Sequence, residues 1–308
     1  MSKFRVLDYD IIYLSYDEPN AEKNYADLCS KIPWAKRVHG VEGSDAAHKA
    51  CAELSETDRF ITVDGDNIID REFLAKEFDL TSHEDAHWNQ QTKLEDCVIS
   101  WSAKNTINGL MYGNGGIKCW PKEKVLNMRT HENADPNNPH AQVDFCWDIQ
   151  YIQMNGCYSE IMNNATPHKA WRAGFREGVK MSLDRGKPVE DINTLWWQNK
   201  HRLYIWQMVG CDVPNGIWAV YGARLGTYMN MLTEWDHTQT RDFTYLNNLW
   251  KEHENVEVAE ECKEIGKKLI NELDLPIAVV PFDKLQSEFF KTVYLNSDRV
   301  IRKQKGKQ

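Results

Sequence analysis

Long apolar runs are missing from this 308-residue sequence, and their absence limits where the protein can work. No stretch approaches the ~20 apolar residues that a helix needs to span a bilayer, so we expect no membrane partner. The amino-terminal segment lacks the apolar core of a signal peptide, which favours a cytoplasmic protein. We find no internal repeat and no low-complexity linker, and the length suits one large α/β domain, alone or with a smaller appendage.

Common metal, redox and nucleotide motifs are also absent. The eight cysteines are scattered without a CxxC pair, which argues against a zinc ribbon or a redox site and is typical of reduced cytosolic thiols. The glycine-dense run 108–116 is not followed by Lys-Ser/Thr and does not stand in strand–GxGxxG–helix order, so it is neither a Walker nor a Rossmann fingerprint. Its glycines either let the backbone approach a ligand or form only a tight turn.

Positive charge is in the minority. With 37 Lys and Arg against 46 Asp and Glu, the formal net charge is −9, which argues against broad, sequence-blind nucleic-acid binding. The segment 299–308 is a local exception, because it contains five basic residues and no acid. Such a basic tail is more often a solvated terminus than a binding element. The 12 tryptophans could stack on sugars or bases, but core packing is the default for most of them.

The amino-terminal third alternates between strand and helix patterns. We predict strands over 11–14, 35–39 and 60–63. Helices are predicted over 21–28 and 46–54. Strands that alternate with helices imply a mainly parallel sheet with right-handed crossovers, so the predicted fold class is α/β.

The rest of the chain changes character towards its end. Strands near 97–101 and 158–162 precede a region in which helical periodicity dominates from about residue 190. We therefore expect a catalytic domain over 1–235 and a helical carboxyl-terminal extension over 236–308 that ends in the basic tail.

The most informative residues are Asp64-Gly65-Asp66, which follow the apolar run Phe60–Val63. A buried strand that ends by presenting two carboxylates from a glycine turn can hold Mg²⁺ or Mn²⁺, and the cation can in turn hold a diphosphate. Asp-x-Asp is short enough to occur by chance, and a second copy, Asp8-Tyr9-Asp10, precedes a strand-like run instead of following one. Because ligands bind at the carboxyl ends of strands in open α/β sheets, position favours the copy at 64–66.

Three elements around this pair stand in an order that resembles a known family. The polar turn Ser15-Tyr16-Asp17-Glu18 follows the first strand, an Ala-rich helix over 46–54 comes next, and the Asp-x-Asp ends the third strand. The segment 10–75 thereby resembles the nucleotide-binding half of GT-A glycosyltransferases. The whole chain is also similar to glycosyltransferase-like proteins of tailed bacteriophages and their environmental relatives, some of which add sugars to hydroxymethylated pyrimidines in DNA. The resemblance implies a GT-A-like mixed sheet flanked by helices, with a mostly helical carboxyl-terminal part.

The resemblance also implies roles for individual residues. It makes Asp66 the direct metal ligand, and Asp64 a second ligand or a partner of the ribose or of metal-bound water. A third ligand usually comes from a later segment in this fold, and His168 is the candidate, although a histidine is more often a satisfied surface or core residue. Asp17 and Glu18 would face the uracil and the ribose, and Arg37 and Lys49 would lie near the donor. Gly115 and Gly116 would lie beside the sugar. Arg172 and Arg176 would neutralise the diphosphate, with Trp171 next to them in the donor site.

An inverting transferase also needs a carboxylate that takes the proton of the acceptor hydroxyl. Asp144 is the first candidate and Asp148 the second, because both follow the loop beside the glycine run. An aspartate at such a position is more often a helix cap or a surface acid than a catalytic base. Whether the transfer inverts or retains the configuration is not encoded in these motifs.

These roles lead to three hypotheses about function. The first is a transferase that moves a sugar, with glucose as the commonest choice, from a UDP-sugar to 5-hydroxymethylcytosine in phage DNA, in the cytoplasm of an infected bacterial host. Beside the basic tail, four residues could contact nucleic acid: Trp196, Trp197, His201 and Arg202. The second is a transferase of the same fold that acts on a glycan, a lipid or a protein. The third is a non-catalytic nucleotide-sugar-binding module, against which the intact Asp17, Asp64 and Asp66 argue.

Overall fold

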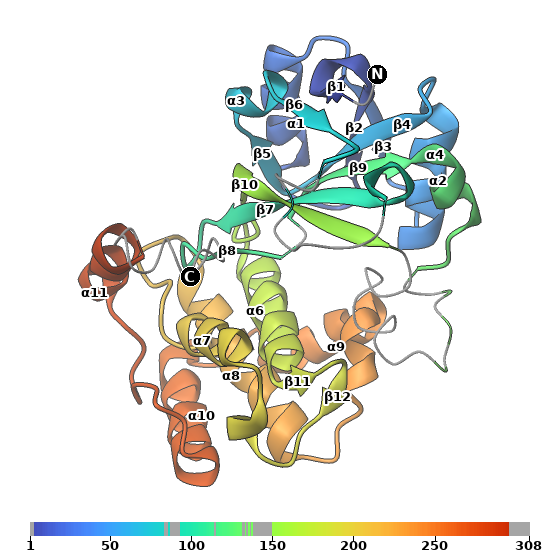
Figure 1. The fold of residues 1–308 in the computed structure, drawn as a ribbon. Helices are drawn as coiled ribbons and strands as arrows, with labels where there is room; N and C mark the ends of the chain where they lie inside the picture. The colour runs from blue at the N-terminus through green and yellow to red at the C-terminus, as the bar shows by residue number, and fades with distance from the viewer. Residues whose placement is uncertain are drawn as a thin grey trace. The chain divides into compact units, whose positions relative to one another are not determined.

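The computed structural model describes residues 3–82, 86, 93–113, 115–130, 133, 135, 137 and 150–295. Their fold is mixed α/β, as expected, and divides into two compact units (Figure 1). Among the described residues, the first unit comprises those up to Asn105 together with Met111–Met162, and the second comprises Thr106–Leu110 and the chain from Asn163 onward.

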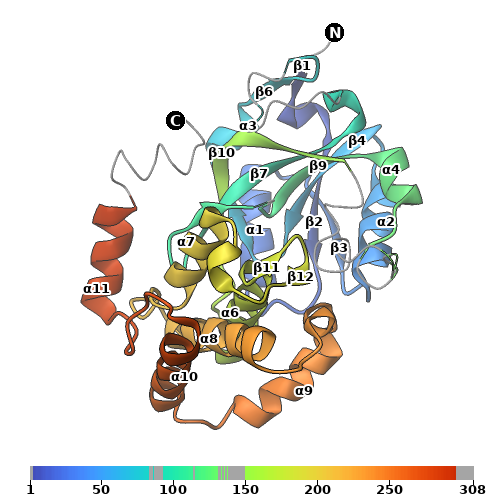
Figure 2. The ribbon, with the colours of Figure 1, turned by 60° about the horizontal axis from the view of Figure 1, so that its bottom comes forward.

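The first unit is built around one curled sheet with the strand order β3-β2-β4-β9-β7-β10-β5. In that order, the strands are Lys36–His39, Asp10–Ser15, Arg59–Asp64, Ile117–Pro121, Val98–Asn105, Tyr151–Ile161 and Asn67–Ile69, and β8 (Met111–Tyr112) pairs with β7. The pairs β2–β3, β2–β4 and β7–β10 are parallel, whereas β9 and β5 run antiparallel to their neighbours. The three strands predicted at the amino terminus are confirmed as a parallel group, but the sheet as a whole is mixed (Figure 2).

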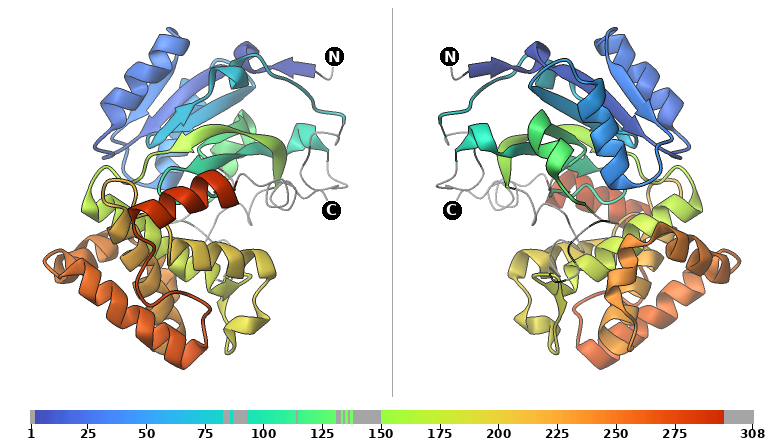
Figure 3. Two further views of the ribbon diagram at one scale, coloured as in Figure 1. Left: turned by 90° about the vertical axis from the view of Figure 1, so that its left-hand side faces the viewer. Right: turned by 90° about the vertical axis from the view of Figure 1, so that its right-hand side faces the viewer.

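Side chains alternate between the two faces of this sheet. On β2, Ile11 and Tyr13 pack in a cluster with residues of α1 (Ala21–Lys31), whereas Ile12 packs with residues of α2 (Ser44–Leu54) and α4 (Lys122–Asn127). This period of two is that of a strand buried on both faces. Helices therefore cover both faces of the sheet, and α1 and α2 confirm the two predicted helices (Figure 3).

Short elements complete the first unit. The strand β1 (Lys3–Arg5) pairs antiparallel with β6 (Glu77–Asp79), and α3 (Arg71–Leu74) is a single turn whose N-cap is Asp70. Phe4, Phe73 and Phe78 from these elements pack into the cluster that also contains α1 residues.

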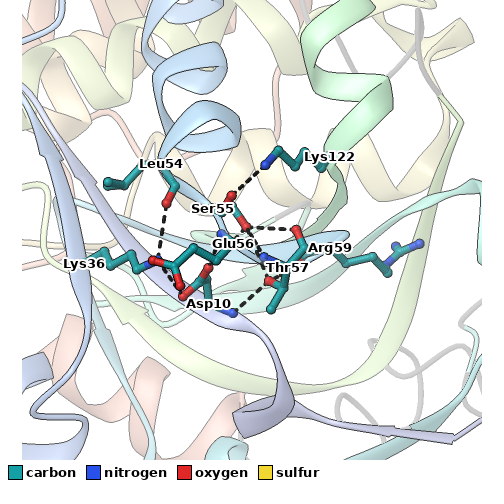
Figure 4. A network of polar contacts seen from close by, with 8 residues as sticks. All are labelled: Asp10, Lys36, Leu54, Ser55, Glu56, Thr57, Arg59 and Lys122. Carbon is teal, nitrogen blue, oxygen red and sulfur yellow. Dashed lines mark hydrogen bonds and ion pairs between the residues drawn. The ribbon is translucent and has the colours of Figure 1, made fainter.

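The second Asp-x-Asp copy lies at the amino end of β2, where Asp10 belongs to a polar network (Figure 4). Its carboxylate accepts the Glu56 amide at 2.6 Å and pairs with Lys36 Nζ at 3.0 Å. Lys36 also pairs with Glu56, and Lys122 Nζ donates to the Ser55 carbonyl at 2.6 Å. Asp10 therefore ties the start of β2 to β3 and to the loop after α2, and the predicted position of this copy ahead of its strand is confirmed.

The second unit is mainly helical. Its helices are α6 (Pro167–Met181), α7 (Trp197–Trp206), α8 (Gly216–Leu232), α9 (Phe243–His253), α10 (Val258–Leu273) and α11 (Lys284–Phe289), and a hairpin joins β11 (Leu183–Asp184) to β12 (Lys187–Pro188). A π-helical turn over Phe290–Tyr294 follows α11. None of the helices in the described ranges is both long enough and apolar enough to cross a membrane.

The fully buried Arg224 of α8 shows why the division expected at residues 235 and 236 falls inside the second unit. Its guanidinium donates to four backbone carbonyls, those of Gln207, Cys262, Ala278 and Val279, at 2.7–2.9 Å. Because donors and acceptors stand on both sides of residue 235, the segments before and after that point form one compact body.

Candidate functional site

The Asp64-Gly65-Asp66 turn lies at the carboxyl edge of the parallel strands. Asp64 is the last residue of β4, and β5 begins at Asn67. In the register of the sheet, Leu14 of β2 pairs with Asp64, and Ser15 pairs with His39 at the end of β3. The two aspartates thus occupy the edge at which open α/β sheets bind ligands, as the sequence predicts.

Two buried side chains hold the turn in place. The Gly65 carbonyl accepts hydrogen bonds from Tyr13 Oη at 2.5 Å and from Asn24 Nδ2 at 3.1 Å. The Asp66 carbonyl accepts the Met162 amide at 2.7 Å. A Cβ on Gly65 would lie 2.6 Å from Glu18 Oε2 and 2.9 Å from Ser15 Cβ, so a larger residue between the two aspartates would displace the Glu18 carboxylate.

Three carboxylates gather around this glycine. Glu18 lies against Gly65 and accepts the Tyr16 amide at 2.8 Å, while Asp64 and Asp66 flank the glycine in sequence. Burial, followed by the charges of Asp64 and Glu18, raises the pKa of the Asp66 carboxyl to about 6. An excess of negative charge at a desolvated carboxyl is the electrostatic environment that a divalent cation relieves.

Lys118 is a member of the site that our sequence analysis missed. It lies on β9 opposite Thr62, it is buried, and its Nζ forms an ion pair with Asp64 Oδ2 at 3.1 Å. The charges of Lys118 and Asp64 also act on the buried His48 of α2. Burial lowers the pKa of His48, the charge of Lys118 lowers it further, and the charge of Asp64 raises it. Only the pairing of β9 with β4 brings Lys118 to this edge, so no local sequence pattern identifies it.

Asn67 and the second glycine of the Gly115-Gly116 pair support the turn from the other side. Asn67 Nδ2 donates to Asp66 Oδ1 at 2.6 Å, and the Gly116 carbonyl accepts the Asp64 amide at 2.9 Å. A Cβ on Gly116 would overlap the Asn67 side-chain amide, so a larger residue at this position would push Asn67 away from Asp66. Gly115 donates its amide to the Trp101 carbonyl at 2.8 Å. The structure thus brings the glycine pair to the aspartates, and its predicted contact with the sugar stays a prediction.

The remaining first-unit candidates lie near the same strands but already have protein partners. Arg37 of β3 donates to both carboxylate oxygens of Glu22, at 2.7 and 3.0 Å, and its guanidinium lies over the ring of Tyr25. Lys49 of α2 pairs with the buried Asp45 at 2.8 Å. Both cations therefore stabilise the scaffold in this structure, whereas Asp17 lies in the exposed turn after β2.

A Mg²⁺ or Mn²⁺ ion fits this turn on three observations. The pKa of Asp66 is raised, side chains of the site pack directly against glycines 65 and 116, and the buried Asn67 Oδ1 has no hydrogen-bond partner among the described residues. In those residues, no group of three or more His, Cys, Asp or Glu side chains is arranged to hold a metal ion. Asp64 and Asp66 would therefore supply part of a ligand set that water and substrate phosphates complete, which is the usual arrangement for Mg²⁺.

The candidate metal-binding and donor-binding residues of the second unit all lie on α6. The ring of His168 stacks on Trp250 with centroids 5.3 Å apart, and Trp171 is fully buried. The guanidinium groups of Arg172 and Arg176 lie 4.7 and 5.1 Å from the ring centre of Phe243. Their roles toward the donor stay predictions.

Two further sets of predicted residues complete the survey. Trp196 and Trp197, at the start of α7, are 58% and 49% exposed, so part of each indole is open to solvent. Asp144 and Asp148, the candidate bases, lie outside the residues that the structure describes.

No protein-family model matches the sequence, and a search of curated proteins finds no significant match. The GT-A resemblance stays a prediction, and the candidate function depends on the chemistry of the site.

Proposed function

We propose that the protein is a metal-dependent glycosyltransferase that uses a nucleotide sugar, with a UDP-sugar as the favoured donor. The observation that supports this most is the Asp64-Gly65-Asp66 turn, which ends a parallel strand, is fixed through its backbone and buries Asp66 beside the charges of Asp64 and Glu18. A cation that takes only part of its ligands from protein suits a substrate that brings phosphate oxygens of its own.

In this proposal each residue has a physical task. Asp66 and Asp64 hold Mn²⁺ or Mg²⁺, which neutralises charge that develops on the leaving diphosphate. Tyr13 and Asn24 keep the turn in place through the Gly65 carbonyl, so the two carboxylates need little reorganisation when the donor binds. Asp17 and Glu18, in the turn after β2, face the nucleoside. Asp144 or Asp148 takes the proton of the acceptor hydroxyl.

The favoured acceptor is 5-hydroxymethylcytosine in DNA, and glucose is the favoured sugar. Support for nucleic acid comes from the exposed Trp196 and Trp197, whose faces can stack on bases, and from the basic segment 299–308. A polar glycan could use the same aromatic faces, and this acceptor is the alternative within the same chemistry.

The test is UDP release from a panel of UDP-sugars, with and without Mn²⁺, in the presence of plain or hydroxymethylcytosine-containing DNA. We expect turnover that requires the cation and the modified base, and a loss of roughly 10²–10³-fold in Asp66→Ala. Asp58→Ala is the matched control, because Asp58 is an exposed carboxylate just before β4 at the opposite edge of the sheet. Full turnover in Asp66→Ala would contradict the metal assignment, and turnover only with glycans would replace the acceptor.

A further inference from the structure

The positively charged side chain of Lys118 lies beside the Asp64–Asp66 turn. Lys118 Nζ lies 3.1 Å from Asp64 Oδ2, and the lysine side chain is 9% exposed. A buried ammonium is costly unless a carboxylate compensates it, so this pair holds Lys118 and Asp64 in a defined arrangement. The lysine reaches the turn from β9, where it stands opposite Thr62, two residues before Asp64 at the end of β4.

The local charges give this pair a consequence for ligand binding. Glu18, Asp64 and Asp66 surround Gly65, and together with Lys118 they leave two net negative charges at full ionisation. A divalent cation balances that charge. Lys118 repels such a cation and competes with it for Asp64, but it attracts the diphosphate that accompanies the cation.

We propose that Lys118 is a positioning residue that weakens the binding of the free cation and strengthens the binding of the cation together with a nucleoside diphosphate. This inference rests on the proposed function, since it assumes that a divalent cation binds at Asp64 and Asp66. The lysine then couples the two ligands: the metal binds weakly alone and firmly only with its phosphate partner. A side chain that merely fills space on β9 does not have these opposite effects.

The variant Lys118→Met tests the proposal because it keeps the length of the buried stem and removes the charge. Mn²⁺ binding to the full chain is measured first by the loss of the free-ion electron paramagnetic resonance signal. UDP binding is then measured by calorimetry at saturating Mn²⁺. We expect the variant to bind Mn²⁺ alone roughly 3–30-fold more tightly and UDP at least threefold more weakly. Lys118→Gln, which retains a hydrogen-bond donor, is measured in parallel and guards against a folding defect of the methionine variant.

Lys36→Met is the matched control. Lys36 forms a similar pair with Asp10, at 3.0 Å, but at the amino edge of the same sheet (Figure 4). The Lys36→Met substitution changes the net charge by the same amount as Lys118→Met, but at the opposite edge of the sheet. We therefore expect the Mn²⁺ and UDP affinities of this variant to equal those of the unchanged protein. A shift of equal size in Lys36→Met would mean that overall charge, and not the position of Lys118, sets the affinity, and this would overturn the inference.

The remaining outcomes separate this inference from the proposed function. The role of Lys118 is overturned, and the cation site stays in place, if Lys118→Met binds Mn²⁺ as tightly as the unchanged protein or more weakly. The same conclusion follows if the UDP affinity changes in the same direction as the Mn²⁺ affinity. If neither the unchanged protein nor either Lys118 variant binds Mn²⁺, with or without UDP, then both the cation site and the role of Lys118 are overturned.

Discussion

Asp66 is the residue whose ionisation the fold disfavours most clearly at the candidate site. Its pKa is raised to about 6 from an ordinary value of 3.8, so the folded state binds a proton more tightly than the unfolded state does. The stability that protonation contributes is fully present below about pH 4 and is lost as the pH rises through 6. We therefore expect Asp66→Asn to raise the free energy of unfolding of the metal-free protein by about 1–2 kcal/mol at pH 7.5, with a gain that disappears near pH 4.

Chemical denaturation at several pH values, with a chelator present, measures this effect. Asp58→Asn is the matched control, and we expect it to change stability by less than about 0.5 kcal/mol because Asp58 is exposed. Added Mn²⁺ is expected to stabilise the unchanged protein and not Asp66→Asn. A gain in Asp66→Asn that is the same at pH 4 and pH 7.5 would show that the carboxylate charge is not its cause.

At this scale, the sequence predicted the residues that follow one another along the chain but not those that meet across the sheet. Asp64, Gly65, Asp66 and Glu18 could be found because two short motifs contain them. Tyr13 and Asn24 look like ordinary core residues of a strand and a helix until the Gly65 carbonyl is placed between them. Lys118 depends on the antiparallel register of β9 against β4, which is set by non-local pairing and leaves no local pattern.

At the scale of elements, α6 and α8 of the second unit pack backbone against backbone. Each helix contains a Gly-x-x-x-Gly spacing, at Gly174 and Gly178 and at Gly222 and Gly226. A Cβ on any of these glycines would overlap a backbone carbonyl of the other helix. The spacing was present in the sequence and is a signal for close helix packing that we did not use.

Gly222→Ala tests how much this contact contributes. The added methyl would overlap the Trp171 carbonyl and lie 2.9 Å from the Phe175 amide nitrogen, so the helices must separate. We expect a loss of about 1–3 kcal/mol in the free energy of unfolding, even though alanine is the better helix former. Thr244→Ala on the exposed face of α9 is the control, with an expected change within about 0.5 kcal/mol. A stabilised Gly222→Ala protein would show that α6 and α8 have room to adjust.

At the scale of the whole molecule, the chain passes between the two units more than once. The segment Thr106–Leu110 belongs to the second unit, although β7 before it and β8 after it belong to the first. The sequence suggested one glycine-dense loop over 108–116, and the structure divides that loop between the units. Hydrophobic periodicity located the elements, but it contains no information on which distant segment each element packs against, so the boundary at 235 could not have been corrected from the sequence alone.

Lys291 holds this inserted segment within the second unit. Its Nζ pairs with Asp212 at 2.5 Å and donates to the carbonyls of Ile107 at 3.0 Å and Thr106 at 3.3 Å, and both side chains of the pair are at most 14% exposed. Lys291→Met leaves the Asp212 charge buried without this lysine and removes one hydrogen bond from each of the two carbonyls. We expect a loss of about 3–5 kcal/mol in the free energy of unfolding and faster amide hydrogen exchange over residues 106–110.

Lys267→Met is the control for this prediction, because its pair with Glu264 is 45% and 54% exposed and is expected to contribute less than about 1 kcal/mol. Combining Lys291→Met with Asp212→Asn removes the unpaired charge and should recover part of the lost stability. If the double variant is as unstable as Lys291→Met, the hydrogen bonds to Thr106 and Ile107, and not the ion pair, are the main contribution of Lys291. If Lys291→Met is as stable as Lys267→Met, the segment 106–110 is held by other contacts, such as the packing of Gly109 against Leu295.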